Sequence, residues 1–178
     1  MDQLVFIDEF GAATNMTRTR ARGPRGRRVV CKTPHGHWKT ISTIAALTTR
    51  GMLGFASFDG ATDTDTFLTF VRDGLAPNLE AGQVVVLDNL PAHKSPKIDE
   101  LIESVGARVM RLPPYSPDFN PIEMAISKIK AVLRRLARRT VDTLFQAIAD
   151  AMDSITATDA VHFIRHCGYA ATMKRKML

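Results

Sequence analysis

Residues 83–88 have the sequence Gln-Val-Val-Val-Leu-Asp. A short, continuous apolar run is typical of a strand that is covered on both faces, because a half-buried strand alternates polar and apolar residues instead. Asp88 stands where the run ends. The stretch therefore predicts a buried central strand that finishes on an acidic side chain.

Three further strands are predicted on the N-terminal side of this run. Residues 3–8 form a short apolar segment that ends at Asp8, and residues 38–49 are rich in β-branched side chains. A turn at residues 50–51 leads into residues 53–58, so these last two strands are expected to pair antiparallel. The polar, arginine-rich segment 9–28 is predicted to be a long hairpin or loop.

Helices are predicted between and after the strands. Helix caps at residues 62–65 precede apolar residues at helical spacing, and Pro77 is expected to stop that helix. A second helix opens at Ser95-Pro96 and ends at Gly106, and residues 108–112 form a fifth strand. After the proline-rich run 113–117, the predicted helices start at Asn120, which acts as the cap before Pro121, at about residue 141 and at about residue 158.

The order of these elements is three strands, helix, strand, helix, strand, and then helices. It predicts an α/β fold of the ribonuclease H-like type. In that fold a mixed five-stranded sheet, with three antiparallel strands followed by parallel ones, is flanked by helices, and here extra helices follow at the C-terminus. Residues 1–178 are expected to form a single domain.

The composition is that of an ordinary globular domain, with 178 residues, 45% hydrophobic and 24% charged. Apolar stretches such as 84–87 are far too short to cross a bilayer, and we see no secretory signal, so no membrane partner is expected. Cys31 and Cys167 are expected to be free thiols in a reducing cytoplasm.

The net charge of +6 favours a polyanionic partner, with nucleic acid first. Two clusters carry much of the positive charge. We predict DNA contact for Arg18, Arg20, Arg22, Arg25, Arg27 and Arg28 in the first cluster, and for Lys128 and Arg135 in the second. Solvated surface charge is the alternative for both. Contacts of this kind would supply affinity and salt dependence but no sequence choice.

Three acids lie at the ends of predicted elements: Asp8, Asp88 and Glu123. The first and fourth strands are neighbours in the predicted fold, and the helix that begins near residue 121 can bring Glu123 to the same edge. Carboxylate oxygens suit Mg²⁺ or Mn²⁺, and two such ions about 3.5–4 Å apart clamp the attacking and leaving oxygens of a phosphodiester. Each acid also has a structural alternative, as a strand terminus, a turn former and a capping-box residue respectively.

The motifs around these acids resemble those of the DDE transposases of the mariner superfamily, in particular the bacterial insertion sequence six-thirty branch. The resemblance is carried by residues 6–9, by residues 86–89 with His93, and above all by Leu-Pro-Pro-Tyr-Ser-Pro-Asp-Phe-Asn-Pro-Ile-Glu, residues 112–123. The 34 residues between Asp88 and Glu123 agree with the spacing in that superfamily.

The resemblance implies a transposase catalytic domain in which Asp8, Asp88 and Glu123 bind two Mg²⁺ or Mn²⁺ ions. In that family water attacks the phosphodiester at the element ends, and the freed 3′-hydroxyl then attacks target DNA without a covalent enzyme intermediate. Asn89 and His93 would orient Asp88 or meet DNA. A homodimer on double-stranded DNA, in a bacterial cytoplasm and nucleoid-associated when active, is also implied.

Family members usually carry an N-terminal helix-turn-helix region, whereas here the first predicted strand begins within a few residues of Met1. We therefore expect that region to be absent, and a separate upstream helix-turn-helix polypeptide is a candidate partner. The chain is either one product of a split reading frame or a fragment or relic. Two other functions stay open: a ribonuclease H-like nuclease or resolvase, which would not need the 112–123 motif, and a non-autonomous DNA-binding remnant. A zinc site at Cys31, His35 and His37 matches no common zinc module.

Overall fold

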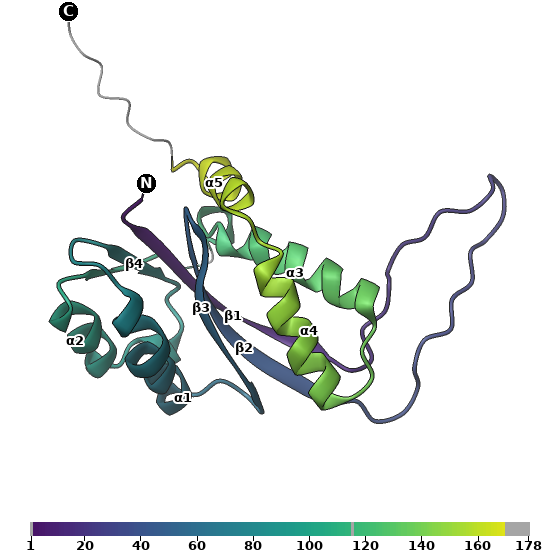
Figure 1. Ribbon diagram of the computed structural model, residues 1–178, viewed down its shortest axis with the longest axis horizontal. Helices are drawn as coiled ribbons and strands as arrows, with labels where there is room; N and C mark the ends of the chain where they lie inside the picture. The colour runs from purple at the N-terminus through teal and green to yellow at the C-terminus, as the bar shows by residue number, and fades with distance from the viewer. Residues whose placement is uncertain (1, 115, 170–178) are drawn as a thin grey trace, which may run out of the picture.

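The structure is a computed structural model that describes residues 2–114 and 116–169. Its centre is a five-stranded sheet in the order β3-β2-β1-β4-β5 (Figure 1). The strands are β1 (Leu4–Ala13), β2 (Thr40–Thr48), β3 (Gly51–Asp59), β4 (Val84–Leu87) and β5 (Arg108–Arg111). The first three pair antiparallel, and β4 and β5 are added parallel to β1. The predicted mixed sheet of the ribonuclease H-like type is confirmed.

Helices cover both faces of the sheet. The α-helices are α1 (Thr64–Thr69), α2 (Pro96–Ser104), α3 (Ile122–Leu136), α4 (Val141–Asp153) and α5 (Ala157–His166). Shorter helical segments are η1 (Phe70–Leu75), η2 (Ala76–Asn78), η3 (Pro91–His93) and η4 (Pro117–Phe119). Figure 1 shows α1 and α2 on one side of the sheet and α3 and α4 on the other. Within the described ranges, no helix has both the length and the apolarity needed to span a bilayer.

The alternation of side chains along β1 divides the core in two. Phe6 and Phe10 belong to the core under α3, α4 and α5, whereas Val5 and Ile7 belong to the core under α1 and α2. Successive residues of a strand point to opposite faces, so each face of β1 is buried by a different helical layer. This alternation also sets which face of the sheet receives each polar side chain further along the strand.

Helix α3 is anchored by its buried stripe, which includes Ile122, Ile126 and Ile129. Full burial of such a side chain stabilises a fold by about 1.5–3 kcal/mol. Ile122 immediately precedes Glu123, so its packing fixes where the first turn of the helix lies. The core thereby determines the position of the third acid.

The boundary predicted after Asp8 is wrong. Strand β1 continues to Ala13, and its pairing with β2 runs without interruption from Phe6 opposite Leu47 to Ala13 opposite Thr40. Asp8 is therefore an interior residue of a ten-residue strand. The reason is visible in the burial of Phe10 and Ala12, which keep the alternation going beyond the acids.

The helix predicted up to Pro77 is also more complex than expected. It begins as predicted, with Asp63 accepting a hydrogen bond from the backbone N–H of Thr66 at 2.8 Å. From Phe70 it widens into the π-helix η1, and Pro77 lies inside the final turn η2, whereas it was predicted to stop the helix. Proline is tolerated there because the first turn of a new helical segment does not need its missing N–H.

The long loop between β1 and β2 comprises residues 14–39, all without helix or strand. Its base is closed by Thr14, whose N–H donates to the carbonyl of Lys39 at 3.0 Å. Arg139 adds hydrogen bonds of 2.9 Å to the carbonyls of Thr14 and Met16. Beyond this base the loop projects away from the body of the molecule (Figure 1).

Candidate active site and metal centre

Parallel pairing of β1 with β4 brings the first two acids together. Leu4 lies opposite Val84 and Phe6 lies opposite Val86. Asp8 and Asp88 each lie two residues beyond the last pair of these strands, and both line the same cleft. The prediction that the first and fourth strands are neighbours is confirmed.

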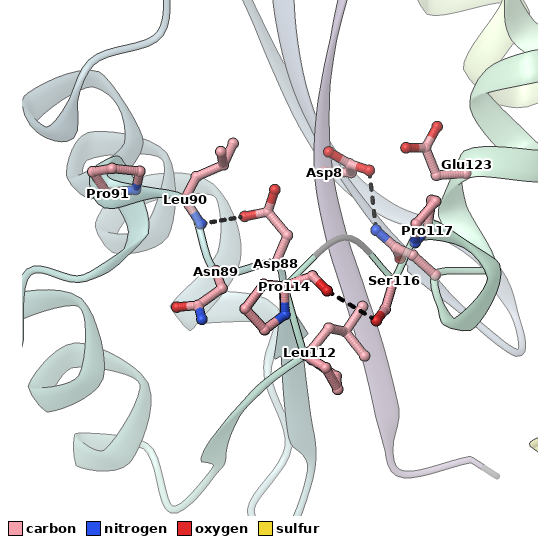
Figure 2. Close-up of a pocket in the computed structure, with 12 residues that line it drawn as sticks. Asp8, Asp88, Asn89, Leu90, Pro91, Leu112, Pro114, Ser116, Pro117 and Glu123 are labelled. Carbon is pink, nitrogen blue, oxygen red and sulfur yellow. Dashed lines mark hydrogen bonds between the residues drawn. The ribbon is translucent and has the colours of Figure 1, made fainter.

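The three acids line one cleft of about 440 Å³. In Figure 2 the carboxylates of Asp8 and Glu123 face each other, and Asp88 projects toward the same space from the opposite side. The proline-rich run forms much of the remaining wall, since Leu112, Pro113, Pro114, Ser116 and Pro117 line the cleft as well. Tyr115, the centre of that motif, lies outside the described residues.

The surroundings of Asp8 disfavour the ionised form of its carboxyl group. Burial raises its pKa from the ordinary 3.8 to about 7, and the carboxylates of Glu123, Glu9 and Asp88 add to this shift. The backbone N–H of Glu9, which donates to Asp8 Oδ1 at 2.7 Å, acts in the opposite direction. Negative charge is thus concentrated at this point of the cleft with too little positive charge beside it.

The surroundings of Asp88, unlike those of Asp8, favour the ionised carboxylate. Burial alone would raise its pKa, but hydrogen bonds from His93 and from the Leu90 N–H lower it. Both donors reach Oδ1, at 2.5 Å from His93 Nδ1 and 3.1 Å from the Leu90 nitrogen. Asp88 is therefore held ionised in a fixed orientation at the mouth of the cleft.

His93 is almost completely buried and bridges two carboxylates. Its Nε2 lies 2.7 Å from Glu9 Oε1, and its ring packs against Phe67 with 4.2 Å between centroids. Burial alone would lower the pKa of His93, but the hydrogen bonds to Asp88 and Glu9 raise it to about 9. At neutral pH the ring is an imidazolium that donates from both nitrogens.

The prediction that Asn120 caps helix α3 is wrong. The N-cap position is Pro121, and no described side chain caps the helix. Asn120 instead turns its buried amide toward the cleft, where Nδ2 donates to Asp8 Oδ2 at 3.0 Å. The capping-box alternative for Glu123 fails with it, because that role requires a polar cap side chain at the helix start. Glu123 itself is exposed.

The cleft fits a hard divalent cation. Its donors are carboxylate oxygens, the type that Mg²⁺ and Mn²⁺ prefer, and Asn120 Oδ1 is buried without a hydrogen-bond partner. Among the described side chains, no three His, Cys, Asp or Glu are already gathered as a closed ligand set. Mg²⁺ does not need one, since it usually binds through one or two carboxylates and completes its shell with water and phosphate.

The other predicted site residues are placed as follows. Asn89 lines the cleft beside Asp88. The six loop arginines from Arg18 to Arg28 are all exposed, and so is Arg135 in the last turn of α3. Lys128 forms a 2.7 Å ion pair with Asp159 of α5. DNA contact by any of them stays a prediction.

Sequence reasoning missed two residues that contact the acids, Glu9 and Asn120. Glu9 was assigned to the loop, although the apolar residues at Phe10 and Ala12 continue the two-residue period and could have kept it in the strand. Asn120 has the sequence position of a cap, and nothing local distinguishes a cap from a side chain that reaches a strand more than a hundred residues away.

A family model described as DDE superfamily endonuclease matches residues 3–145. The chain belongs to this family. The matched range contains Asp8, Asp88 and Glu123 together with every strand of the sheet. A search of curated proteins found no match.

Solved structures of Mos1 transposase have the same fold. The paired-end complex of Mos1 transposase with the left transposon end matches this DDE superfamily endonuclease with a TM-score of 0.73 at 14% identity. The match covers 93% of this chain and 52% of that one. The Mos1 transposase catalytic domain with raltegravir and Mn matches with a TM-score of 0.70 at 12% identity, over 93% of this chain and 78% of that one. This chain thus spans about half the length of the Mos1 chains in the paired-end complex.

Proposed function

We propose that this chain is the catalytic domain of a DNA transposase, which cleaves DNA at the ends of an insertion sequence and joins the freed 3′-hydroxyl to target DNA. The observation that carries the proposal is the half-buried Asp8 carboxyl, which faces Glu123 in a cleft that Asp88 also lines. Membership in the DDE superfamily endonuclease family supports it. Further support comes from the Mos1 structures, which include a strand transfer complex and complexes with Mn or Mg.

Asp8, Asp88 and Glu123 would hold two Mg²⁺ or Mn²⁺ ions, which activate the attacking hydroxyl and stabilise the charge that develops on the phosphate. The protein's own contribution is placement. Asn120 holds Asp8, and His93 with the Leu90 N–H holds Asp88, so both acids meet the phosphodiester in fixed orientations.

The remaining parts of the proposal concern partners and setting. We infer that the arginines of loop 14–39 and the basic residues Lys128 and Arg135 contact the DNA backbone of the element ends or the target. Pairing of two DNA ends by a homodimer follows the Mos1 paired-end complexes. The bacterial insertion sequence six-thirty branch, a cytoplasmic setting and an upstream helix-turn-helix polypeptide as the sequence reader belong to the same proposal.

The test is a cleavage and joining assay with purified protein. Its substrates are plasmid DNA that carries the gene with its flanking sequence, and an oligonucleotide with a free 3′-hydroxyl. Wild-type protein should cleave and join only with Mg²⁺ or Mn²⁺. Asp88→Ala should retain about one-hundredth of the activity or less, as expected for loss of a central electrostatic group, and should still bind DNA. Asp59→Ala, which removes an exposed acid of β3, is the matched control.

Undiminished cleavage by Asp88→Ala would contradict the assignment of the three acids. Cleavage without joining would indicate a nuclease or resolvase. DNA binding by the wild-type protein without cleavage in either metal would indicate a non-catalytic remnant.

A further inference from the structure

Glu9 follows Asp8 directly on β1, so the two side chains leave opposite faces of the sheet. Asp8 points to the cleft, where Asn120 of the α3 side reaches it. Glu9 points to the face under α1 and α2, which also buries Ile7. A carboxylate on that face is behind the proposed active site and does not line its cleft.

We propose that Glu9 is a positioning residue, which fixes the orientation of the Asp88 carboxylate through the buried imidazole of His93. The inference rests on the proposed function, because it concerns how Asp88 is presented to a divalent metal and a DNA phosphate. It assigns to Glu9 a role in the reaction although its side chain touches neither.

The bridge is constrained at three points. His93 Nε2 lies 2.7 Å from Glu9 Oε1, and His93 Nδ1 lies 2.5 Å from Asp88 Oδ1. The ring face packs against Phe67, and the His93 side chain is only 1% exposed. With both nitrogens and one face occupied, the imidazole has a single orientation.

This orientation determines which oxygen of Asp88 faces the cleft. His93 and the Leu90 N–H both donate to Oδ1, and within the described chain no hydrogen bond reaches Oδ2. The carboxylate is thus held by one oxygen and presents the other. Hydrogen bonds to a metal-binding carboxylate orient it, and loss of such outer partners typically lowers metal affinity or activity about 10–100-fold.

Removal of Glu9 would leave His93 Nε2 buried without an acceptor, which is unfavourable. The imidazole ring would then rotate to a different hydrogen-bond partner for Nε2. This rotation would break the hydrogen bond between His93 Nδ1 and Asp88 Oδ1. The backbone of His93 would stay in place, because Arg111 donates to its carbonyl at 2.9 Å and is itself held by Asp99 at 2.7 Å. The effect of Glu9 is therefore expected on the orientation of a side chain and not on the fold of the η3 turn.

The experiment compares Glu9→Ala and Glu9→Gln with the wild-type protein. The first readout is Mn²⁺ binding to the DNA-free chain by electron paramagnetic resonance, and the second is the split of cleavage kinetics into kcat and KM. Glu9→Ala should weaken Mn²⁺ binding about 10–100-fold and lower kcat more than it raises KM. Glu9→Gln keeps an acceptor oxygen for His93 and should stay within about threefold of wild type on both readouts. The control is Glu103→Gln, an exposed carboxylate of α2 outside the bridge.

Mn²⁺ affinity of Glu9→Ala within about threefold of wild type would overturn the proposal. An equal loss in Glu9→Gln and Glu9→Ala would overturn it too, because an acceptor oxygen would then not be what matters. If Glu9→Ala does not fold, Glu9→Asp takes its place, because the shorter side chain withdraws the acceptor from His93 Nε2 and keeps the charge; a loss of Mn²⁺ affinity in Glu9→Asp with none in Glu9→Gln supports the proposal, and wild-type affinity in Glu9→Asp overturns it. If Asp88→Asn does not weaken Mn²⁺ binding, the proposed metal site is refuted. If Asp88→Asn lowers the Mn²⁺ affinity and Glu9→Ala does not, only the role of Glu9 is refuted.

Discussion

The acid-lined cleft and the arginine-rich loop 14–39 are both charged, but they are built in opposite ways. In the cleft, Asp8 receives a hydrogen bond from the distant Asn120, and Asp88 is held by His93, which in turn contacts the distant Glu9. The strands that carry both acids are packed on both faces. In the loop, Arg18 to Arg28 are exposed, and the tertiary hydrogen bonds described above close only its base. The difference follows from what each task demands. In-line attack on phosphorus requires oxygens placed to within a fraction of an ångström, whereas attraction to a phosphate backbone requires charge alone.

Glu123→Gln should produce the largest effect, because it removes one of the acids without changing the shape of the side chain. We expect cleavage and joining to fall about 10²–10³-fold or more, while DNA affinity and thermal stability stay near wild type, since Glu123 is exposed and caps nothing. Product formation on a denaturing gel measures the first, and fluorescence anisotropy with labelled duplex DNA measures the second.

Asp118→Asn is the matched control for Glu123. Asp118 is an exposed acid of the adjacent turn η4 and does not line the main cleft. A loss in Asp118→Asn as large as that in Glu123→Gln would mean that general negative charge at this rim, and not a defined ligand, supports the reaction. The contrast between an ordered cleft and a merely charged surface would then disappear.

The loop arginines should give the reverse result, with binding changed and chemistry preserved. Replacing Arg18, Arg20 and Arg22 together by Gln should lower the slope of log K against log salt concentration by about 2.7, since each phosphate contact contributes about 0.9. At about 0.1 M salt we expect DNA affinity to fall about tenfold to a hundredfold, with kcat at saturating DNA unchanged.

Arg50→Gln combined with Arg72→Gln is the comparison for the loop variant. Both arginines are exposed but are already paired, with Glu80 and Asp73 respectively. An equal change of salt slope in this control would show that net charge and not the loop governs binding. A loop variant that binds DNA normally but has a low kcat would show that the loop takes part in the chemistry, so that the cleft and the loop would not have separate tasks.

The cleft was also far more predictable from the sequence than the loop. The apolar run before Asp88 and the element order place Asp8 and Asp88 on neighbouring strands, because parallel pairing is set by burial patterns that the sequence displays. The motif around Glu123 supplied the third acid. Loop 14–39 has charge but no period, so its residues predict a partner and no geometry.

The errors within the cleft have a common physical cause. Local rules assign Asn120 to a helix cap, yet its contact with Asp8 determines its position. For Glu9 the local period could have predicted the strand, but only the fold shows its contact with His93. A short polar side chain satisfies its hydrogen bonds wherever burial brings a partner, and a residue more than eighty positions away leaves no local trace. Asp8 and Asp88 were predictable because they follow apolar runs, and Glu123 because of its motif, whereas the contacts of Asn120 and Glu9 were not predictable.

The smallest effect is expected for stability, and it tests whether the cleft is strained by charge. The pKa of Asp8 is about 7 in the folded protein against 3.8 ordinarily, so the folded state retains a proton that the unfolded state releases. The contribution of Asp8 is fully present below pH 3.8 and is lost as the pH rises through 7. Above that pH an ionised, half-buried Asp8 beside Glu123, Glu9 and Asp88 destabilises the metal-free fold. Asp8→Asn imitates the protonated form and should therefore raise the Tm in a chelator at pH 8.5 by about 2–4 °C, equivalent to about 1 kcal/mol in a domain of this size.

The same difference should be smaller at pH 5 and approach zero only below about pH 3.8, where Asp8 is protonated in the folded and in the unfolded state. His93, whose pKa is raised to about 9, also loses its contribution as the pH rises, but it is present in both proteins and cancels in the comparison. Added Mn²⁺ should invert the order at pH 8.5, because it neutralises the acids of the wild-type cleft and binds Asp8→Asn less well. The opposite result would be a Tm for Asp8→Asn below that of the wild-type protein at pH 8.5 in chelator. It would show that hydrogen bonds stabilise the ionised Asp8 more than burial and the neighbouring carboxylates destabilise it. In that case the hydrogen bonds of the cleft would stabilise it without a cation, and the metal-free cleft would not be destabilised by its negative charge.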